Sequence, residues 1–152
     1  MKAIFYYDTP IGKIGIAETD GAISHILFDG EKASSDFEIK ETKVIKSTAK
    51  QLQEYFKGKR CTFDVPLFYD GTPFQISVWK ALETIPFGET KSYKDIAIQV
   101  GCPKGPRAVG LANNRNKIPI IIPCHRVIGA NGKLVGFGGG LETKQFLLDL
   151  EK

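Results

Sequence analysis

A cysteine, a histidine and an arginine follow one another in the segment "KIPIIIPCHRVIG", residues 117–129. The thiolate form of cysteine is a nucleophile, and a neighbouring base or cation lowers the thiol pKa and raises the thiolate fraction. Beside Cys124, His125 can serve as the base and Arg126 as a permanent cation. Adjacent side chains often diverge, so a buried structural cysteine next to a surface histidine fits the same letters. The segment therefore indicates nucleophilic chemistry at Cys124, with the structural cysteine as the alternative.

The apolar residues before the cysteine predict how it is held. Ile118 and the run 120–122 have the β-branched composition of a short buried strand. Pro119 and Pro123 deny this run ordinary ladder pairing on both sides. We therefore expect Cys124 on a stiff, irregular and buried segment.

Length and composition exclude several classes of protein. With 152 residues and 42% hydrophobic content, the chain can bury a core as one compact domain or two small lobes. Its longest apolar run is far shorter than the roughly 20 residues of a membrane-spanning helix. The first residues lack the hydrophobic region of a signal peptide. A cytoplasmic protein is expected. Its three cysteines, Cys61, Cys102 and Cys124, are widely separated and accompanied by only two histidines, which indicates neither a disulfide framework nor a metal site.

Positive charge is concentrated in one part of the chain, although the net charge is only +4. Between residues 91 and 133 the only acidic residue is Asp95. The basic residues of this range are Lys91, Lys94, Lys104, Arg107, Arg115, Lys117, Arg126 and Lys133. Such a block predicts a phosphate-bearing partner such as nucleic acid, with an ordinary solvated surface as the alternative.

The first 70 residues have the pattern of a small α/β lobe. Alternating apolar residues broken by turn residues predict three short antiparallel strands within 3–28, and helical spacing predicts a helix over 42–56. A further strand is expected to begin at Cys61, which we expect in the core. Turn residues at 70–73 favour a boundary, so we divide the chain into an α/β lobe at 1–70 and a second domain at 71–152.

The second domain is predicted to be mostly helical and to contain the cysteine loop. The first predicted helix covers "FQISVWKALETI", and the last covers 141–151. Between them, one helix follows an N-cap at Ser92 and ends at Gly101, and another starts near Pro106. Two helices joined by a short glycine turn match a helix-turn-helix, here within the basic block. The third helix has small residues at Ala108, Gly110 and Ala112, which suit either close approach to a groove or tight packing on a neighbouring helix.

The strings "RAVGLANNRNKIPIII", "PCHRVIG" and "GFGGGLETKQFLL", with "GTPFQISVWKALETIPFGETKSY" upstream, resemble the O6-alkylguanine-DNA alkyltransferases over roughly residues 71–151. The resemblance implies a monomeric DNA repair protein without a cofactor that acts on duplex DNA in the cytoplasm, nucleoid or nucleus. It would flip the damaged base and move the alkyl group irreversibly to its own cysteine, one turnover per molecule. O6-alkylguanine is the implied substrate, with O4-alkylthymine as a second candidate.

The resemblance also assigns catalytic roles to individual residues. Cys124 would be the acceptor, His125 its base acting through a bound water, and Glu151 the carboxylate that orients the histidine. Tyr93 would hydrogen-bond the departing base, and Asn116 would brace the turn that holds the site.

Substrate and DNA contacts follow from the same resemblance. The carbonyl oxygens of Cys124 and Val127 would accept from the guanine amine, and the N–H near Gly138 would reach its oxygen. Phe137 stands where an aromatic with a hydroxyl is common. Arg107 would fill the space of the flipped base, and the other implied DNA-binding residues are Ala108, Gly110, Ala112 and Arg115.

Two other functions fit parts of the sequence. A non-catalytic sensor of alkylated bases would keep the helix-turn-helix and the pocket but replace the acceptor, so Cys124 argues against it. A helix-turn-helix transcription regulator would leave both Cys124 and His125 without a function.

Overall fold

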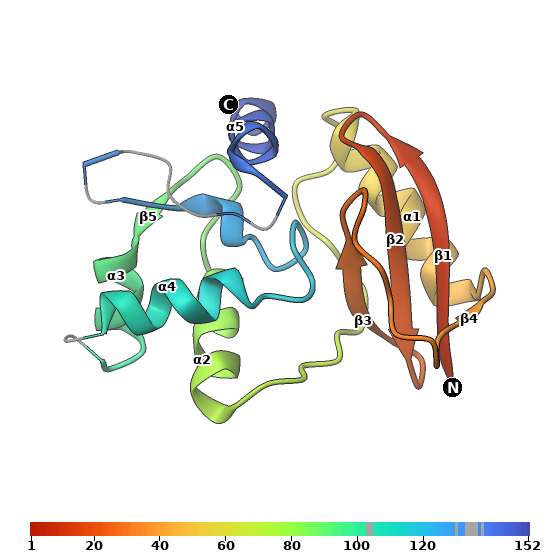
Figure 1. Ribbon diagram of the computed structural model, residues 1–152. Helices are drawn as coiled ribbons and strands as arrows, with labels where there is room; N and C mark the ends of the chain where they lie inside the picture. Colours follow the sequence, from red (N-terminus) through yellow and green to blue (C-terminus); the bar gives the residue numbers. More distant parts are fainter. Residues whose placement is uncertain (103–104, 130, 133–136, 138) are drawn as a thin grey trace. The chain divides into compact units, whose positions relative to one another are not determined.

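The computed structural model describes residues 1–102, 105–129, 131–132, 137 and 139–152. It forms two compact units, Met1–Tyr69 and Asp70–Lys152 (Figure 1). The first is a small sheet with a helix, and the second is mostly helical, as expected for a mixed α/β protein. Within the described ranges no helix is long and apolar enough to cross a membrane.

The first unit is built on a four-stranded sheet in the order β3-β2-β1-β4. Strands β1 (Lys2–Thr9), β2 (Gly12–Thr19) and β3 (Ala22–Leu27) are antiparallel, which confirms the three predicted strands. Tight turns with positive φ at Gly12 and Gly21 join them. Strand β4 (Glu38–Ile39) pairs in parallel with β1 and was not predicted, because two exposed residues give no periodic signal.

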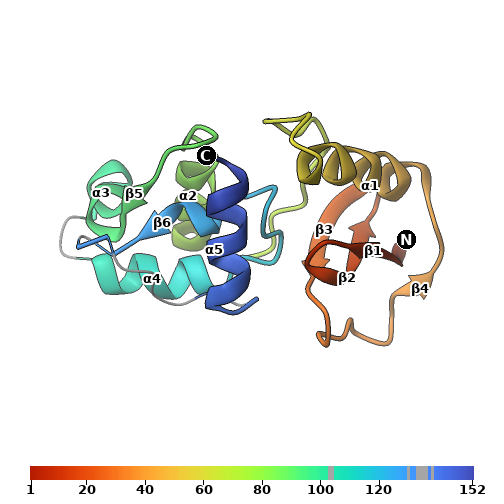
Figure 2. The ribbon, with the colours of Figure 1, turned by 90° about the horizontal axis from the view of Figure 1, so that it is seen from above.

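One amphipathic helix, α1 (Lys43–Phe56), lies on this sheet (Figure 2). Its N-cap is Thr42, whose hydroxyl accepts from the Ile45 N–H at 3.4 Å. Ile45, Leu52 and Tyr55 are fully buried along the face toward the strands. The predicted helix over 42–56 is confirmed.

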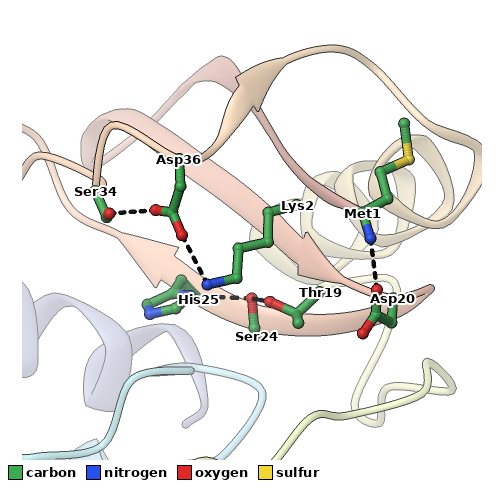
Figure 3. A network of polar contacts seen from close by, with 8 residues as sticks. All are labelled: Met1, Lys2, Thr19, Asp20, Ser24, His25, Ser34 and Asp36. Carbon is green, nitrogen blue, oxygen red and sulfur yellow. Dashed lines mark hydrogen bonds and ion pairs between the residues drawn. The ribbon is translucent and has the colours of Figure 1, made fainter.

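Polar contacts tie the loop before β4 to the sheet (Figure 3). The Lys2 ammonium lies 2.8 Å from an Asp36 carboxylate oxygen. On β3, the Ser24 hydroxyl contacts the Thr19 hydroxyl and Nδ1 of His25, each at 3.0 Å. His25 is therefore part of the sheet's own hydrogen bonding.

The prediction of a strand that begins at Cys61 is wrong, and so is the prediction that this cysteine lies in the core. Cys61 is exposed, and its segment pairs with the sheet only through a bridge between Ile23 and Leu67. The Gln51 side chain instead satisfies the backbone of Asp64, accepting from its N–H at 2.9 Å and donating to its carbonyl at 3.1 Å. A side chain of α1 thus replaces the neighbouring strand that a ladder would need.

The second unit packs three helices together and adds the cysteine loop. Helices α2 (Pro73–Leu82), α3 (Tyr93–Gln99) and α4 (Pro106–Asn114) contact one another, and α5 (Leu141–Leu150) contacts the short 3-10 helix η1 (Cys124–Arg126). Strands β5 (Lys91–Ser92) and β6 (Val127–Ile128) form a parallel pair.

Capping residues set the ends of α3 and α4. Ser92 caps α3 and forms a reciprocal capping box with Asp95. Gly101 follows α3 with a φ of +78°, and Pro106 opens α4. The Trp79 indole N–H of α2 donates to the Ala112 carbonyl of α4 at 2.9 Å. The two helices of the predicted helix-turn-helix, α3 and α4, therefore pack against α2.

Candidate active site

The segment that leads to Cys124 is buried and irregular, as expected. The side chain of Asn116 braces it at two points: Oδ1 accepts from the Ile118 N–H at 3.0 Å, and Nδ2 donates to the Ile122 carbonyl at 2.8 Å. Between these points Ile120 has a φ of +74°. A β-branched residue in this region costs about 1–3 kcal/mol and persists where surrounding contacts enforce it. The loop is thus held in a strained conformation at the cysteine.

Cys124 begins η1 and is 4% exposed. Burial raises the pKa of its thiol to about 11, despite opposing effects of the Asn116 side chain and the Lys144 charge. The thiol is therefore protonated at neutral pH in the free protein. This differs from the sequence-based expectation that its neighbours lower the thiol pKa. A base must remove the proton before the sulfur can attack.

His125 is placed to be that base. Its Nε2 lies 2.6 Å from Oε2 of Glu151, and both side chains are buried. Two further contacts from Arg126 hold Glu151 as a carboxylate, so Nε2 carries the hydrogen and donates it. Burial lowers the His125 pKa, so the ring is neutral and its Nδ1 is a free base.

Arg126 has a different partner from the one expected. Its guanidinium donates to Glu151 from Nε at 2.8 Å and from Nη2 at 3.0 Å, and Nη1 donates to the Ile85 carbonyl at 2.7 Å. Arg126 is 6% exposed, so it belongs to a buried ion pair and not to a DNA-facing surface. It holds the carboxylate that orients His125.

Lys144 is a site residue that sequence reasoning missed. It lies on α5, is fully buried, and donates from Nζ to the Val127 carbonyl at 2.7 Å. Burial lowers its pKa, and its charge favours the Cys124 thiolate. No local signal marked it, since a lysine in a helix is ordinarily solvated. The Val127 carbonyl, expected to accept from guanine, already accepts from this lysine.

Tyr93 is brought to the site by the pairing of β5 with β6. Lys91 pairs with Val127 and Ser92 with Ile128, so the first residue of α3 lies beside the cysteine segment. Burial, followed by repulsion from a Cys124 thiolate, raises the pKa of Tyr93. The phenol stays protonated and available as a donor. Of the other expected substrate contacts, Phe137 is half-buried, and Gly138 lies outside the described residues.

Helix α4 presents part of the predicted DNA surface. Arg107 and Ala108 on the helix, and Arg115 directly after it, are exposed. A Cβ at the half-buried Gly110 would meet only the Tyr93 ring, at 3.9 Å, so helix packing does not require a glycine there. Ala112 is 2% exposed and faces the core. Helix packing thus accounts for the small residue at 112 but not for those at 108 and 110, where close approach to another surface stays a prediction.

The assembled groups can do one kind of chemistry. A buried thiol, a neutral imidazole fixed by a carboxylate, and a protonated phenol suit proton removal, nucleophilic attack and support of a leaving group. Within the described ranges no cluster of three histidine, cysteine or acidic residues could hold a metal ion.

Comparisons with known proteins cover both units. Residues 4–69 match the ribonuclease-like domain and residues 73–152 the DNA binding domain of 6-O-methylguanine DNA methyltransferase. A methylated-DNA–protein-cysteine methyltransferase of Methanosarcina barkeri is 51% identical, with 97% of each chain covered. The constitutive enzyme of that name from Bacillus subtilis is 49% identical, covering 95% of this chain and 92% of the relative.

Solved structures agree with these matches. The O6-methylguanine methyltransferase of Mycobacterium tuberculosis superposes with a TM-score of 0.93 at 44% identity, covering 100% of this chain and 93% of the other. The Mycobacterium tuberculosis OGT in complex with DNA gives 0.94 at 45% identity, covering 99% and 92%. The chain therefore belongs to the 6-O-methylguanine DNA methyltransferase family.

Proposed function

We propose that this protein repairs DNA by moving the alkyl group of O6-alkylguanine onto Cys124, once per molecule. The observation that carries the proposal is the buried Cys124 followed by His125, whose Nε2 lies 2.6 Å from Glu151, in a chain of this family. The same chemistry extends to O4-alkylthymine if the pocket admits a pyrimidine. The protein acts as a monomer on duplex DNA in the cytoplasm.

The reaction begins with loss of the thiol proton. His125 takes it at Nδ1 through a water molecule, and Glu151 stabilises the imidazolium that forms. The thiolate then attacks the alkyl carbon: a carbon–sulfur bond forms, the carbon–oxygen bond breaks, and its electron pair stays on the guanine oxygen. The thioether lacks a good leaving group, so Cys124 is not regenerated and one protein repairs one lesion.

The departing guanine accumulates negative charge that must be stabilised. Tyr93 is half-buried next to the cysteine segment and keeps its phenolic proton, so it can donate to the base. The imidazolium proton ultimately returns to the medium as guanine takes up a ring proton, which closes the proton balance.

A guanine within a duplex cannot reach a cysteine that is 4% exposed, so the base must leave the stack. The exposed Arg107, the second residue of α4, is proposed to occupy the space left behind. Ala108 and Gly110 allow the helix close access to a groove, and Arg115 supplies a phosphate contact. Because its side chain is buried, Ala112 is left out of this interface.

The test is an intact-mass measurement after incubation with a duplex that contains one O6-methylguanine. We expect each molecule to gain one methyl group in place of one hydrogen, with peptide mapping locating it on Cys124. An unmodified duplex of the same sequence is the control. Binding of the damaged duplex without a mass change would contradict the proposal and favour a non-catalytic sensor.

A further inference from the structure

Two buried polar atoms at the acceptor site have no hydrogen-bond partner among the described residues: Oδ1 of Asn113 and Nδ1 of His125. Asn113 is 2% exposed and His125 is fully buried. An unsatisfied buried polar group costs about 1–3 kcal/mol, and native proteins satisfy nearly all such groups with protein atoms or ordered water. Two in one site therefore indicate a shared bound group.

Both atoms are acceptors. An amide Oδ1 can only accept, and Nδ1 of His125 carries no hydrogen because Nε2 donates to Glu151 at 2.6 Å. Asn113 lies near the end of α4, and its Nδ2 is 3.5 Å from the Cys124 carbonyl oxygen. The Oδ1 atom belongs to the same amide group, so Asn113 places an unsatisfied acceptor close to the residue that directly precedes His125.

Water is the smallest molecule that can donate to two acceptors at once. We infer that Asn113 is a positioning residue of the acceptor site, whose Oδ1 and the Nδ1 of His125 hold one water molecule between them. The oxygen of this water accepts from the Cys124 thiol. This inference rests on the proposed function and adds a residue to it, since a His125 base alone leaves the Asn113 oxygen unexplained.

The proton balance of this step is complete. The thiol proton passes to the water oxygen while one water hydrogen passes to Nδ1 of His125, which leaves a thiolate, an intact water molecule and an imidazolium. The second water hydrogen stays bonded to the water oxygen and is donated to Asn113 Oδ1 throughout. The Asn113 oxygen thereby fixes the orientation of the water. It also stabilises the positive charge that develops on the water while the proton moves from the thiol to His125.

The test compares single-turnover transfer rates across pH on a saturating duplex with one O6-methylguanine. Asn113→Leu has a similar volume but no acceptor, and we expect a loss of about tenfold at neutral pH, the effect of one hydrogen bond on a transition state. The loss should shrink as the pH approaches 11, the thiol pKa, because hydroxide then removes the proton without the relay. A tenfold loss that is the same at every pH would show a merely structural role and overturn the inference.

Two companion variants separate the acceptor atom from the packing of α4. Asn113→Asp keeps an oxygen at the same place, so it should recover a large part of the rate lost in the leucine variant; equal rates in the two variants would contradict the inference. Val109→Ala removes buried volume from the same helix without a polar atom, and its pH profile should keep the wild-type shape. DNA affinity, measured with each change combined with Cys124→Ala, should stay unchanged.

A measurement on the unaltered protein covers the case in which the variants do not fold. A high-resolution crystal structure should show a water within hydrogen-bond distance of both Asn113 Oδ1 and His125 Nδ1. Either atom bonded to a protein group in place of water would overturn the inference. The outcomes remain distinct from those for the proposed function: absence of methyl transfer by the wild type removes the function, whereas transfer with an unchanged Asn113→Leu profile removes only the role of Asn113.

Discussion

The charged pairs described in the sheet unit are exposed, whereas the helical unit has exposed pairs such as Lys117 with Asp70 and, in addition, one buried set. In the sheet unit, Lys2 pairs with Asp36 and Arg60 with Glu54, and all four side chains are at least partly exposed. In the helical unit, Glu151 binds both His125 and Arg126 with every partner nearly inaccessible to solvent. Exposed pairs contribute about 0–1 kcal/mol, whereas removing one partner of a buried pair costs about 3–5 kcal/mol.

This difference indicates where the chemistry is. Nothing in the sheet unit requires its pairs to be desolvated. The buried set in the helical unit orients an imidazole beside a thiol, and burial shifts the pKa of each in the direction that keeps both neutral. Matched substitutions in the two units test this difference.

The largest effect is expected at the acceptor itself. Cys124→Ala should abolish methyl transfer, because the nucleophile is gone, while affinity for the damaged duplex is retained. Cys61→Ala, in the sheet unit, should transfer at the wild-type rate because that thiol is exposed and lies outside the site. Transfer and gel-shift assays check both, and any residual transfer by the Cys124 variant would remove it as the acceptor.

Next in size is the shared carboxylate. Glu151→Gln should slow transfer by about 100-fold or more, the range for loss of an oriented general base, and should destabilise the protein by about 3 kcal/mol because Arg126 loses its counter-charge. Glu54→Gln breaks the exposed pair with Arg60 and should cost less than about 1 kcal/mol. Denaturant unfolding gives the energies. Equal costs for the two variants would disprove the contrast between the units.

A smaller effect is expected from the buried lysine. Lys144→Met removes a positive charge that favours the thiolate, so the Cys124 pKa should rise and transfer at neutral pH should slow by about tenfold per pKa unit. The exposed Lys13 of the sheet unit offers the matched control, Lys13→Met, which should leave the rate unchanged. A pH–rate profile that is the same for Lys144→Met and the wild type would show that this charge does not act on the thiol.

The smallest effect is expected in the pH dependence of stability, through His125. Burial lowers the His125 pKa, so below about pH 6.5 the unfolded chain binds more protons than the folded one. The contribution of His125 to stability is therefore present above about pH 6.5 and is lost as the pH falls below it. Replacing His125 by Asn should flatten the dependence of the unfolding free energy on pH between about 5 and 7. An unchanged pH dependence in the His125 variant would contradict the assignment.

Local sequence signals predicted most of the helical unit. Ser92, Gly101 and Pro106 mark helix ends through their own backbone and side-chain preferences, which need no distant partner. The proline-flanked isoleucine run predicted a buried irregular segment for the same reason. Strand pairing depends on distant neighbours instead, so the segment from Cys61 was assigned to a strand that the sheet does not contain.

The candidate site was predicted in its residue types but not in its electrostatics. A cation beside Cys124 suggested a lowered thiol pKa, yet Arg126 turns toward Glu151, which lies 25 residues later in the chain. Burial then raises the thiol pKa, and the residues next to Cys124 in the sequence do not predict its burial in the fold. Lys144 and the role proposed for Asn113 were missed because both depend on burial of the side chain against the cysteine segment.

The proposed mechanism requires Cys124 to be a protonated thiol that depends on a base. Its most direct test is a thiolate titration by ultraviolet absorbance, taken as the difference between the wild type and Cys124→Ala in a background that lacks Cys61 and Cys102. The Cys124 thiolate of the free protein should appear with a midpoint near pH 11. A thiolate already present at neutral pH would contradict it, because no base would then be needed.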